Sequence, residues 1–287
     1  MEDIYGQVFR KIRINQKLTL REVAQDIVSI SYLAKFETGQ TNITLTIFLK
    51  LLSRINVKIE EFLYYCGDST SEIFDRFALE LIKHYRNNDI RELIRLKKHE
   101  ENLYSLTGFK LHKINGIMIA AAILDIDSSY LIPKEDVILI SEYLLQIPYW
   151  SEYNLFVLSA THAIIPNYLL QTLISEIKKQ KNSNLISYTN VRPMIFLFHH
   201  VSITFLRNND IKSAIESHKY ALNMLETGFF FEKNRSIFID GLIKISLGNT
   251  YEGIQNANKA INTLQLLEPS LVKKYTSELK RHLENLK

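Results

Sequence analysis

The side chains best suited to a chemical task lie close together near the N-terminus: Ile30, Ser31, Tyr32 and Lys35. Ile30 can touch the methyl group of thymine, the Ser31 hydroxyl can donate or accept a hydrogen bond, and Lys35 can reach guanine or a phosphate. In a short helix these side chains lie on or beside one outward face, because positions three and four residues apart are neighbours. The set therefore gives the helix an outward face that can reach base edges of DNA.

Two short helices are needed to hold this set in place, and residues 18–39 predict them. Apolar residues recur at helical spacing up to Ile27 and Val28, which are expected to close the first helix. Ser29 then supplies a side-chain oxygen that can cap the start of the second helix. Leu33 faces back onto the first helix while the DNA-reading set points away. The segment is therefore predicted to be a helix-turn-helix.

Basic side chains gather around this segment, although the net charge of the whole chain is only +4. Acidic residues are sparse over the same stretch, so positive charge is concentrated where DNA phosphates would lie. The candidates for phosphate-side contacts are Arg10, Arg13, Lys17, Arg21, Thr41 and Asn42. A solvated surface position is the simpler interpretation of any single one. Glu37 is expected to pair with Arg10 or Arg13 and thus to hold the fold rather than read DNA.

The chain is predicted to be all-α and to contain two domains. Only 9 Gly and 5 Pro interrupt long stretches of helical periodicity, and strand-like alternation is rare. Residues 1–66 predict five short helices, residues 67–71 a short polar linker, and residues 72–287 a helical body. Cys66 is the single cysteine, so an internal disulfide is impossible, and a packed thiol is favoured over a redox sensor.

The helical body shows internal similarity. The sequence RNNDIRELI at residues 86–94 is echoed by RNNDIKSAI at residues 207–215. A second pair, SHKYALNML at residues 217–225 and NANKAINTL at residues 256–264, begins 39 residues apart, a spacing typical of solenoid repeats. The body is therefore predicted to be an array of helical hairpins similar to tetratricopeptide repeats (TPR). The last segment, residues 270–287, has one apolar face and should either cap the array or pair with a partner chain.

Stacked helical hairpins form a concave surface that can bind an extended peptide. Polar side chains on the inner helices can hold such a peptide by hydrogen bonds to its backbone. The candidates for this role are Asn154, Asn190, Arg192, His199, Asn234 and Arg235. A helix cap, a loop contact or a surface position is the simpler interpretation of each.

The N-terminal pattern resembles an Xre-type repressor domain over roughly residues 1–65. The matching positions are the Leu18-Thr19 start, Ala24, the Ser29 cap, Leu33, the Phe36-Glu37-x-Gly39 ending, and Asn56-Val57 before Glu60-Glu61-Phe62. With a TPR-like body behind it, the chain resembles the Rgg/MutR/PlcR regulators of the RRNPP group. The Trp150-Ser-Glu-Tyr153 sequence is similar to a Trp-x-x-Tyr block of the Rgg/MutR C-terminal domain.

The resemblance implies a cytoplasmic, homodimeric transcription regulator of a Gram-positive bacterium that takes part in quorum sensing. It implies a short signalling peptide in the concave face and a palindromic double-stranded operator. Two departures stand out. Ile27 and Val28 occupy a turn where many such domains have glycine, and Thr38 and Gln40 flank Gly39 where the Rgg branch has arginine and glutamate.

The sequence contains none of the patterns GxxxxGK[ST], GxGxxG, GxSxG or HExxH, so we expect no enzyme and no cofactor. His199 and His200 diverge by about 100° on a helix, which argues against a shared metal ion. No apolar run is long enough for a membrane span, and the acidic start lacks the features of a secretion leader. Two other functions stay open: a protein-interaction scaffold tethered to DNA, and a small-molecule-responsive repressor.

Overall fold

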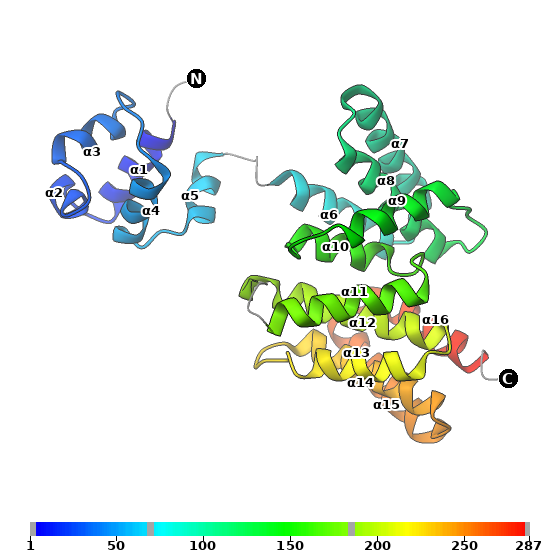
Figure 1. The fold of residues 1–287 in the computed structure, drawn as a ribbon. Coiled ribbons are helices and arrows are strands. Elements are labelled where there is room, and N and C mark those ends of the chain that lie inside the picture. The colour runs from blue at the N-terminus through cyan, green and yellow to red at the C-terminus, as the bar shows by residue number, and fades with distance from the viewer. Residues whose placement is uncertain (1–3, 68–71, 183–186, 285–287) are drawn as a thin grey trace. The chain divides into compact units, whose positions relative to one another are not determined.

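The computed structural model describes residues 4–67, 72–182 and 187–284. Within these ranges the chain consists of helices and the loops between them, which confirms the all-α prediction (Figure 1). The chain divides into two compact units, Met1–Ala78 and Leu79–Lys287. The proposed linker, residues 67–71, lies largely outside the described residues. The predicted domain limits at residues 66 and 72 therefore stay a prediction.

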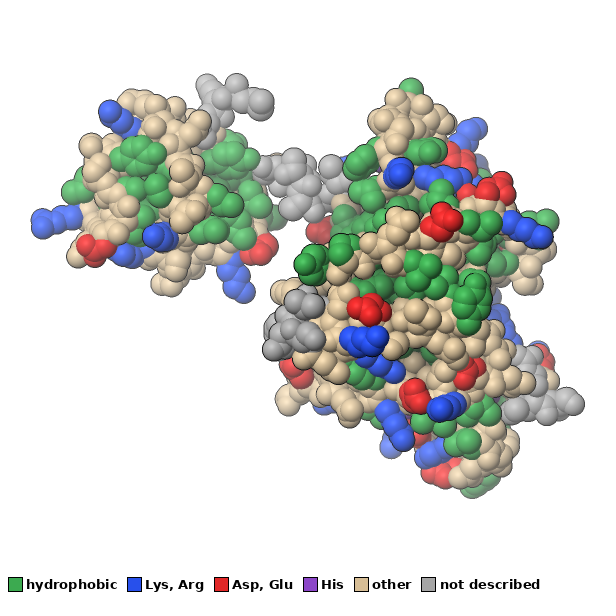
Figure 2. All heavy atoms as spheres, viewed as in Figure 1, with side chains coloured by type: hydrophobic (Ala, Val, Ile, Leu, Met, Phe, Trp, Pro, Cys, Tyr) green, Lys and Arg blue, Asp and Glu red, His purple; other side chains and the backbone are tan. Residues whose placement is uncertain are grey.

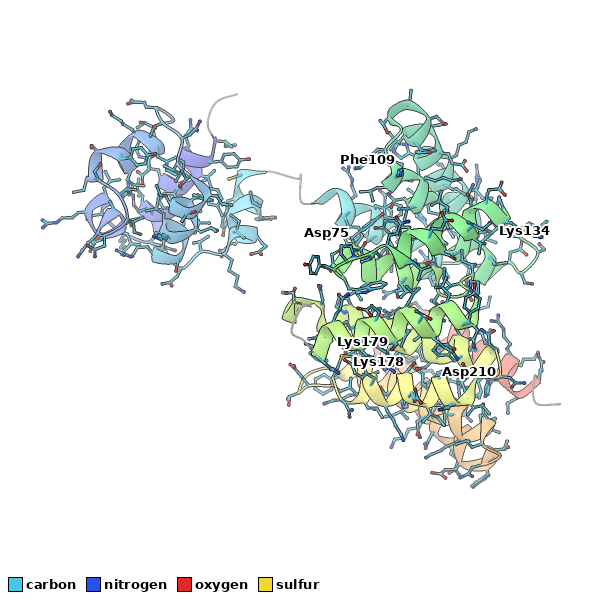
Figure 3. All side chains as sticks on the ribbon, viewed as in Figure 1. Asp75, Phe109, Lys134, Lys178, Lys179 and Asp210 are labelled. Carbon is cyan, nitrogen blue, oxygen red and sulfur yellow. The ribbon has the colours of Figure 1, made fainter. Side chains whose placement is uncertain are left out.

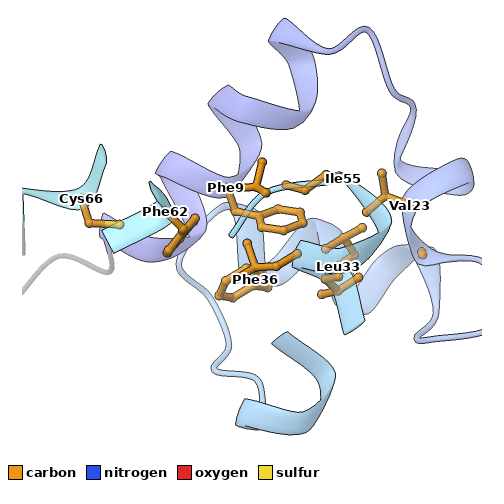
Figure 4. Close-up of a cluster of buried hydrophobic side chains, with 11 residues drawn as sticks. Phe9, Val23, Leu33, Phe36, Ile55, Phe62 and Cys66 are labelled. Carbon is orange, nitrogen blue, oxygen red and sulfur yellow. The ribbon is translucent and has the colours of Figure 1, made fainter. Parts of the chain in front are cut away.

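The N-terminal unit contains the predicted set of short helices. They are α1 (Ile4–Asn15), α2 (Leu20–Ala24), α3 (Ile30–Glu37), α4 (Leu45–Arg54) and α5 (Ile59–Cys66). Their apolar faces enclose one core, in which the rings of Phe9 and Phe36 meet edge to face at 5.9 Å (Figure 4). Cys66 lies at the margin of this core with 7% of its surface exposed, so it is packed rather than presented to solvent.

The first helix of the helix-turn-helix is shorter than the sequence predicted. It ends at Ala24, and Ile27 and Val28 pack against the core from the turn that follows. The chain makes this turn at Asp26, which adopts a left-handed conformation with φ of 61°. Aspartate tolerates that conformation better than most residues, so the turn forms without a glycine.

The second unit consists of longer helices. In chain order, the helices after α5 are α6 (Glu72–Arg86), α7 (Ile90–Thr107), α8 (Lys110–Ile126), α9 (Lys134–Leu145), α10 (Glu152–Thr161), α11 (Asn167–Asn182), the short 3-10 turn η2 (Tyr188–Asn190), α12 (Val191–Arg207), α13 (Ile211–Leu222), α14 (Phe230–Ser246), α15 (Thr250–Leu267), η3 (Pro269–Leu271) and α16 (Val272–Glu284). The division between the two units falls inside α6.

The second unit is built as two rows of helices. Helix α10 packs against both α8 and α12, and α12 packs against α14, so α8, α10, α12 and α14 form an inner row (Figure 1). Helices α9, α11, α13 and α15 form the outer row, of which α13 and α15 cover α12 and α14. This is the predicted stack of helical hairpins. On the face seen in Figure 2, basic and acidic side chains of this unit are interspersed rather than segregated.

The repeated Arg-Asn-Asn-Asp sequences form equivalent turns. Asn88 and Asn209 take left-handed conformations with φ of 50° and 59°. Each is followed by an aspartate that caps the next helix: Asp89 accepts from the backbone of α7, and Asp210 from that of α13. Asp210, labelled in Figure 3, also accepts a hydrogen bond from Gln171 of α11. The sequence similarity therefore reflects a repeated structural device.

Helix α16 packs onto the array. Its buried side chains include Tyr275 and Leu279, and the Tyr275 ring meets that of Phe238 on α14 at 4.6 Å. The described part of α16 thus caps the array, and the other predicted role, pairing with a partner chain, stays a prediction.

Helices α14 and α15 approach each other through two glycines. A Cβ atom on Gly253 would stand 2.5 Å from the carbonyl oxygen of Gly241 and 2.6 Å from Cγ1 of Ile245. Both distances are too short for real atoms, and one of the obstacles is backbone. Glycine at this position is therefore a packing requirement.

Replacing Gly253 with alanine is expected to destabilise the second unit by about 1–3 kcal/mol, the usual cost of overpacking a core. The measurement is thermal unfolding monitored by circular dichroism. Gly116 in α8 is the matched control, because a Cβ atom there meets nothing within 4 Å. Gly116→Ala should instead stabilise the protein by about 0.5–1 kcal/mol. Similar effects of the two substitutions would contradict this account of the α14–α15 contact.

Candidate functional site

The DNA-reading set is held by the start of α3. The Ser29 hydroxyl accepts a hydrogen bond from the Tyr32 amide at 3.2 Å, which confirms the predicted cap. Leu33 and Phe36 are buried on the opposite side of the helix, where they anchor it to the domain core (Figure 4). The cap fixes where the helix begins, and the core contacts fix which side of it faces solvent.

The outward side of α3 carries three of the four predicted base-reading residues in exposed positions. Ile30 is 48% exposed, and Ser31 and Lys35 are exposed as well. Tyr32 is half-buried, and its hydroxyl donates to the carbonyl oxygen of Asn42 at 2.9 Å. Tyr32 thus ties α3 to the loop before α4, while the other three side chains remain available to a ligand.

The predicted phosphate-side residues divide into two groups. Arg10 at the solvent face of α1, Lys17 after it, Arg21 of α2 and Asn42 are exposed, and Thr41 is half-buried beside Asn42. Arg13 is different and its surface assignment is corrected, because only 8% of it is exposed.

The burial of Arg13 has a clear cause. Its Nε and Nη2 atoms each donate to a carboxylate oxygen of Glu37 at 2.6 Å, and Nη1 donates to the carbonyl oxygen of Leu18 at 2.7 Å. Hydrogen bonds to Glu37 raise the pKa of Arg13 above its ordinary value, although burial opposes this shift. The pairing of Glu37 predicted from the sequence is confirmed, with Arg13 as the partner. The pair joins α1 to α3.

The six predicted peptide-contact residues do not form one surface. Two of them are buried between helices. His199 is fully buried, and its Nε2 atom lies 2.8 Å from the Ser236 hydroxyl. The Asn234 amide donates to the carbonyl oxygen of Ala260 at 3.1 Å. These contacts join α12 to α14 and α14 to α15. His199 and Asn234 are therefore withdrawn from the ligand-contact set, because both side chains are buried between helices.

The remaining four residues have individual environments. Asn154 is half-buried, accepts from the Tyr143 hydroxyl and donates to the carbonyl oxygen of Tyr149, so it braces the region between α9 and α10. Asn190 is buried at the start of α12. Arg192 is exposed and Arg235 is half-buried. The two arginines are thus the members of the set with charged groups that a ligand can approach.

A group of polar side chains that sequence reasoning missed connects the inner row to α6 and α16. We call Tyr85, Asp125, Arg207, Lys274 and Glu278 the polar cluster. Arg207 donates to Glu278 at 3.0 and 2.5 Å and to Asp125 at 3.2 Å. Tyr85 donates to Asp125, and Lys274 lies over the Tyr85 ring, 3.6 Å from its centre.

The charges of the polar cluster are strongly coupled. Burial alone would raise the pKa of Asp125, but Lys274 and Arg207 outweigh it and hold this pKa well below its usual range. The Asp125 carboxylate is therefore charged at neutral pH. Because its contacts join residues as far as 189 positions apart, no local pattern in the sequence predicts the cluster.

Five histidines of the second unit are held neutral by burial, which lowers their pKa. The pKa falls to about 3 for His162 and about 4 for His218, and it is also lowered for His199, His200 and His282. The His162 and His200 rings stack at 5.2 Å. All 8 histidines of the chain lie beyond residue 83, so this effect belongs to the second unit.

Acid is therefore expected to destabilise the second unit between pH 6.5 and 5. A histidine with a folded-state pKa below its unfolded value of about 6.5 takes up protons more readily when unfolded. Its stabilising contribution is full above that pH and falls by about 1.4 kcal/mol per pH unit below it. Melting temperatures measured at pH 7, 6 and 5 test this. His218→Gln should reduce the dependence of the melting temperature on pH, and the control His99→Gln, at an exposed position, should not. A melting temperature unchanged from pH 7 to 5 would contradict the assignment.

A capped helix with an exposed polar side, followed by a two-row helical array, defines a helix-turn-helix DNA-binding regulator with a helical repeat domain. A family model described as HTH-type transcriptional regulator Rgg, C-terminal domain, matches residues 94–278, and a helix-turn-helix model matches residues 9–62. The chain belongs to the Rgg family of helix-turn-helix transcriptional regulators. The sequence-based resemblance is thereby confirmed.

Solved structures agree with this fold over nearly the whole chain. A putative transcriptional regulator from Listeria monocytogenes EGD-e has a TM-score of 0.80 and 23% identity, with 99% of each chain covered. The SHP pheromone receptor Rgg2 of Streptococcus dysgalactiae has a TM-score of 0.76 and 20% identity, covering 96% of this chain and 99% of that chain. ComR from S. thermophilus, in complex with DNA and its signalling peptide ComS, has a TM-score of 0.63 and 14% identity, covering 97% and 99%.

No helix in the described ranges is long and apolar enough to cross a membrane. Likewise, no group of metal-ligating side chains large enough to hold an ion is found among the described residues.

Proposed function

We propose that this regulator controls transcription in response to a short signalling peptide bound by its second unit, as in quorum sensing. The observation that carries the proposal is the combination of a helix-turn-helix over residues 9–62 with a repeat domain of the Rgg type over residues 94–278. Rgg2 is a pheromone receptor, and ComR has been seen with both DNA and peptide. Their shared fold supports the same pair of ligands here.

On the DNA side, Ile30, Ser31 and Lys35 read base edges while Tyr32 keeps α3 in position. The phosphate contacts come from Arg10, Lys17, Arg21, Thr41 and Asn42. A two-fold homodimer would place two such helices on a palindromic operator, with half-sites about one or two DNA turns apart. Because its target is chromosomal DNA, the protein acts in the cytoplasm.

On the peptide side, the ligand lies along the inner row of helices. Arg192 and Arg235 supply charged contacts, Asn190 lies at the start of the helix that carries Arg192, and Asn154 braces the region between α9 and α10. Peptide binding and operator binding are then linked: a peptide that changes operator affinity by some factor has its own affinity changed by the same factor when operator is bound.

The test begins by selecting genomic DNA fragments that the purified full-length protein retains. Peptides encoded by small reading frames beside its gene are then synthesised. One of them should raise the melting temperature of the protein, because a ligand selective for the native state stabilises it. The same peptide should change the affinity for the selected DNA, measured by fluorescence anisotropy.

Two outcomes would overturn the proposal. If no genomic fragment binds with salt-dependent affinity, the DNA-binding assignment fails. If a folded protein partner stabilises the second unit and no peptide does, the interaction-scaffold function replaces peptide control. Stabilisation by a small metabolite in place of peptides would favour the small-molecule-responsive repressor.

A further inference from the structure

Within the described part of the chain, Arg235 of α14 is a cation without a hydrogen-bond or ion-pair partner. Its Nε atom is buried and has no hydrogen-bond partner among the described residues, and none of the ion pairs found in the described ranges includes Arg235. Arg207 in the neighbouring inner helix is satisfied by two carboxylates. Burying a guanidinium nitrogen without a hydrogen-bond acceptor costs free energy, so a group like Arg235 normally has an anionic partner.

The surroundings of Arg235 have an excess of positive charge. The charges of Arg235 and Arg207 both lower the pKa of Lys274, so these three cations interact. The polar cluster supplies two carboxylates, Asp125 and Glu278. Both carboxylates are already engaged by Arg207. The charge of Arg235 is therefore left for an anion from outside the described chain.

The nearby histidines are uncharged, so they neither compensate the charge of Arg235 nor compete with it for an anion. Burial is the main cause that lowers the pKa of His200 and His199, and the charge of Arg235 adds to it. Both rings are therefore neutral at physiological pH. An anion that reaches Arg235 therefore meets neutral imidazole rings on α12.

An apolar wall lies one helical turn from Arg235. Phe231 precedes it by four residues on α14, so the two side chains share a face of the helix. The Phe231 ring pairs with that of Phe196 on α12, with 5.8 Å between ring centres, and both rings are half-buried. The site therefore combines an unpaired guanidinium with an aromatic surface that can receive an apolar side chain.

We propose that Arg235 binds a carboxylate of the ligand, the free C-terminal carboxylate of a short peptide whose last residue is apolar. A guanidinium can bind a carboxylate through two parallel hydrogen bonds, and the Phe196–Phe231 pair would contact the adjoining side chain. An acidic side chain within the peptide offers the same chemistry. The proposal rests on the proposed peptide function, which it makes more specific.

The first experiment uses immobilised full-length protein and random seven-residue peptide pools, with retained peptides identified by mass spectrometry. One pool has free C-termini, the second is amidated, and the third has free C-termini but lacks Asp and Glu. We expect at least tenfold greater retention from the first and third pools than from the second. Retention that disappears in the third pool would assign the carboxylate to a side chain and overturn the C-terminal assignment.

The substitutions Arg235→Met and Arg235→Lys test the residue itself. Retention should be lost with methionine and partly preserved with lysine, which keeps the charge without the two-point geometry. Because the guanidinium has no partner in the unliganded chain, Arg235→Met should melt at or above the wild-type temperature. Arg95→Met is the matched control, since Arg95 lies on α7 with 81% of its side chain exposed, and it should retain peptides normally. A large drop in the melting temperature of Arg235→Met would instead assign it a structural role.

The outcome separates this inference from the proposed function. Equal retention of free and amidated peptides would overturn the carboxylate site while leaving peptide control intact. If the wild type retains nothing from any pool, peptide control fails, and the anion site is then tested with N-acetylphenylalanine and its amide. The acid should raise the melting temperature of the wild type but not of Arg235→Met, and the amide should raise neither. No shift with the acid would overturn the inference.

Discussion

Replacing Arg207 with methionine is expected to lower the stability of the second unit by about 3 kcal/mol, the lower end of the cost of breaking a buried ion pair. For a unit of this size the melting temperature should fall by about 6–12 °C, since each kcal/mol is worth about 2–4 °C. The reason is that the substitution leaves two carboxylates without the guanidinium that they share. Glu278 loses two hydrogen bonds and Asp125 loses one.

The lower end of that range applies because both carboxylates keep other partners. Lys274 and Tyr85 still contact Asp125, and Arg281 still lies 3.6 Å from Glu278. Arg281→Met is the matched control. Its side chain is 48% exposed, so its loss should cost under about 1 kcal/mol.

A double-mutant cycle makes the prediction sharper. Combining Arg207→Met with Glu278→Leu should recover part of the lost stability, because an apolar pair leaves no carboxylate at that position without its guanidinium. Thermal unfolding at pH 7 measures all four proteins. If Arg207→Met alone melts within about 2 °C of the wild type, the polar cluster does not stabilise the fold as described.

Replacing Ser31 and Lys35 together with alanine is expected to abolish specific operator binding while leaving the fold intact. A good base contact contributes about 1–3 kcal/mol to discrimination, so losing two should weaken binding to the selected DNA by about 30-fold or more. Both side chains are exposed. The Ser31 hydroxyl lies 3.2 Å from the Ser29 hydroxyl, but the cap itself is the hydrogen bond from the Tyr32 amide to Ser29, so the cap of α3 should survive.

The measurement is affinity for the selected fragment and for scrambled DNA over a range of salt concentrations. The double variant should lose the preference between the two sequences, whereas loss of a phosphate contact weakens binding to both and reduces the salt dependence. Lys58→Ala removes the same charge at the start of α5, outside the reading helix, and should keep the preference. Unchanged discrimination by the double variant would show that α3 is not the reading helix.

Local patterns in the sequence predicted the DNA-binding unit well because its determinants are close in the chain. The Ser29 cap, the buried Leu33 and the turn after α3 all depend on neighbours a few residues away. The end of α2 was predicted incorrectly, because Ile27 and Val28 keep an apolar spacing that a helix and a packed turn share. The turn after α2 is made by Asp26 in a left-handed conformation, and no glycine in the sequence marks that position.

The ligand side was harder to predict because it depends on contacts between distant helices. Helix α12 is buried on most sides, so helical periodicity does not reveal which of its side chains face a ligand. His199 and Arg235 were therefore placed in one set, although His199 is fully buried between helices and Arg235 is only half-buried. Arg13 was misplaced for a similar reason: its partner Glu37 lies 24 residues away.

The polar cluster also has a consequence for how the second unit comes apart. In an open stack of repeats each hairpin touches only its neighbours, so such proteins can fray from either end. Here Tyr85 of α6 and Lys274 of α16 are in contact although 189 positions separate them. Because α6 and α16 are joined, neither end of the described part of this unit is a free terminal repeat from which melting could spread. Its unfolding should be a single all-or-none event, and hydrogen exchange should protect α6 and α16 as strongly as the helices between them.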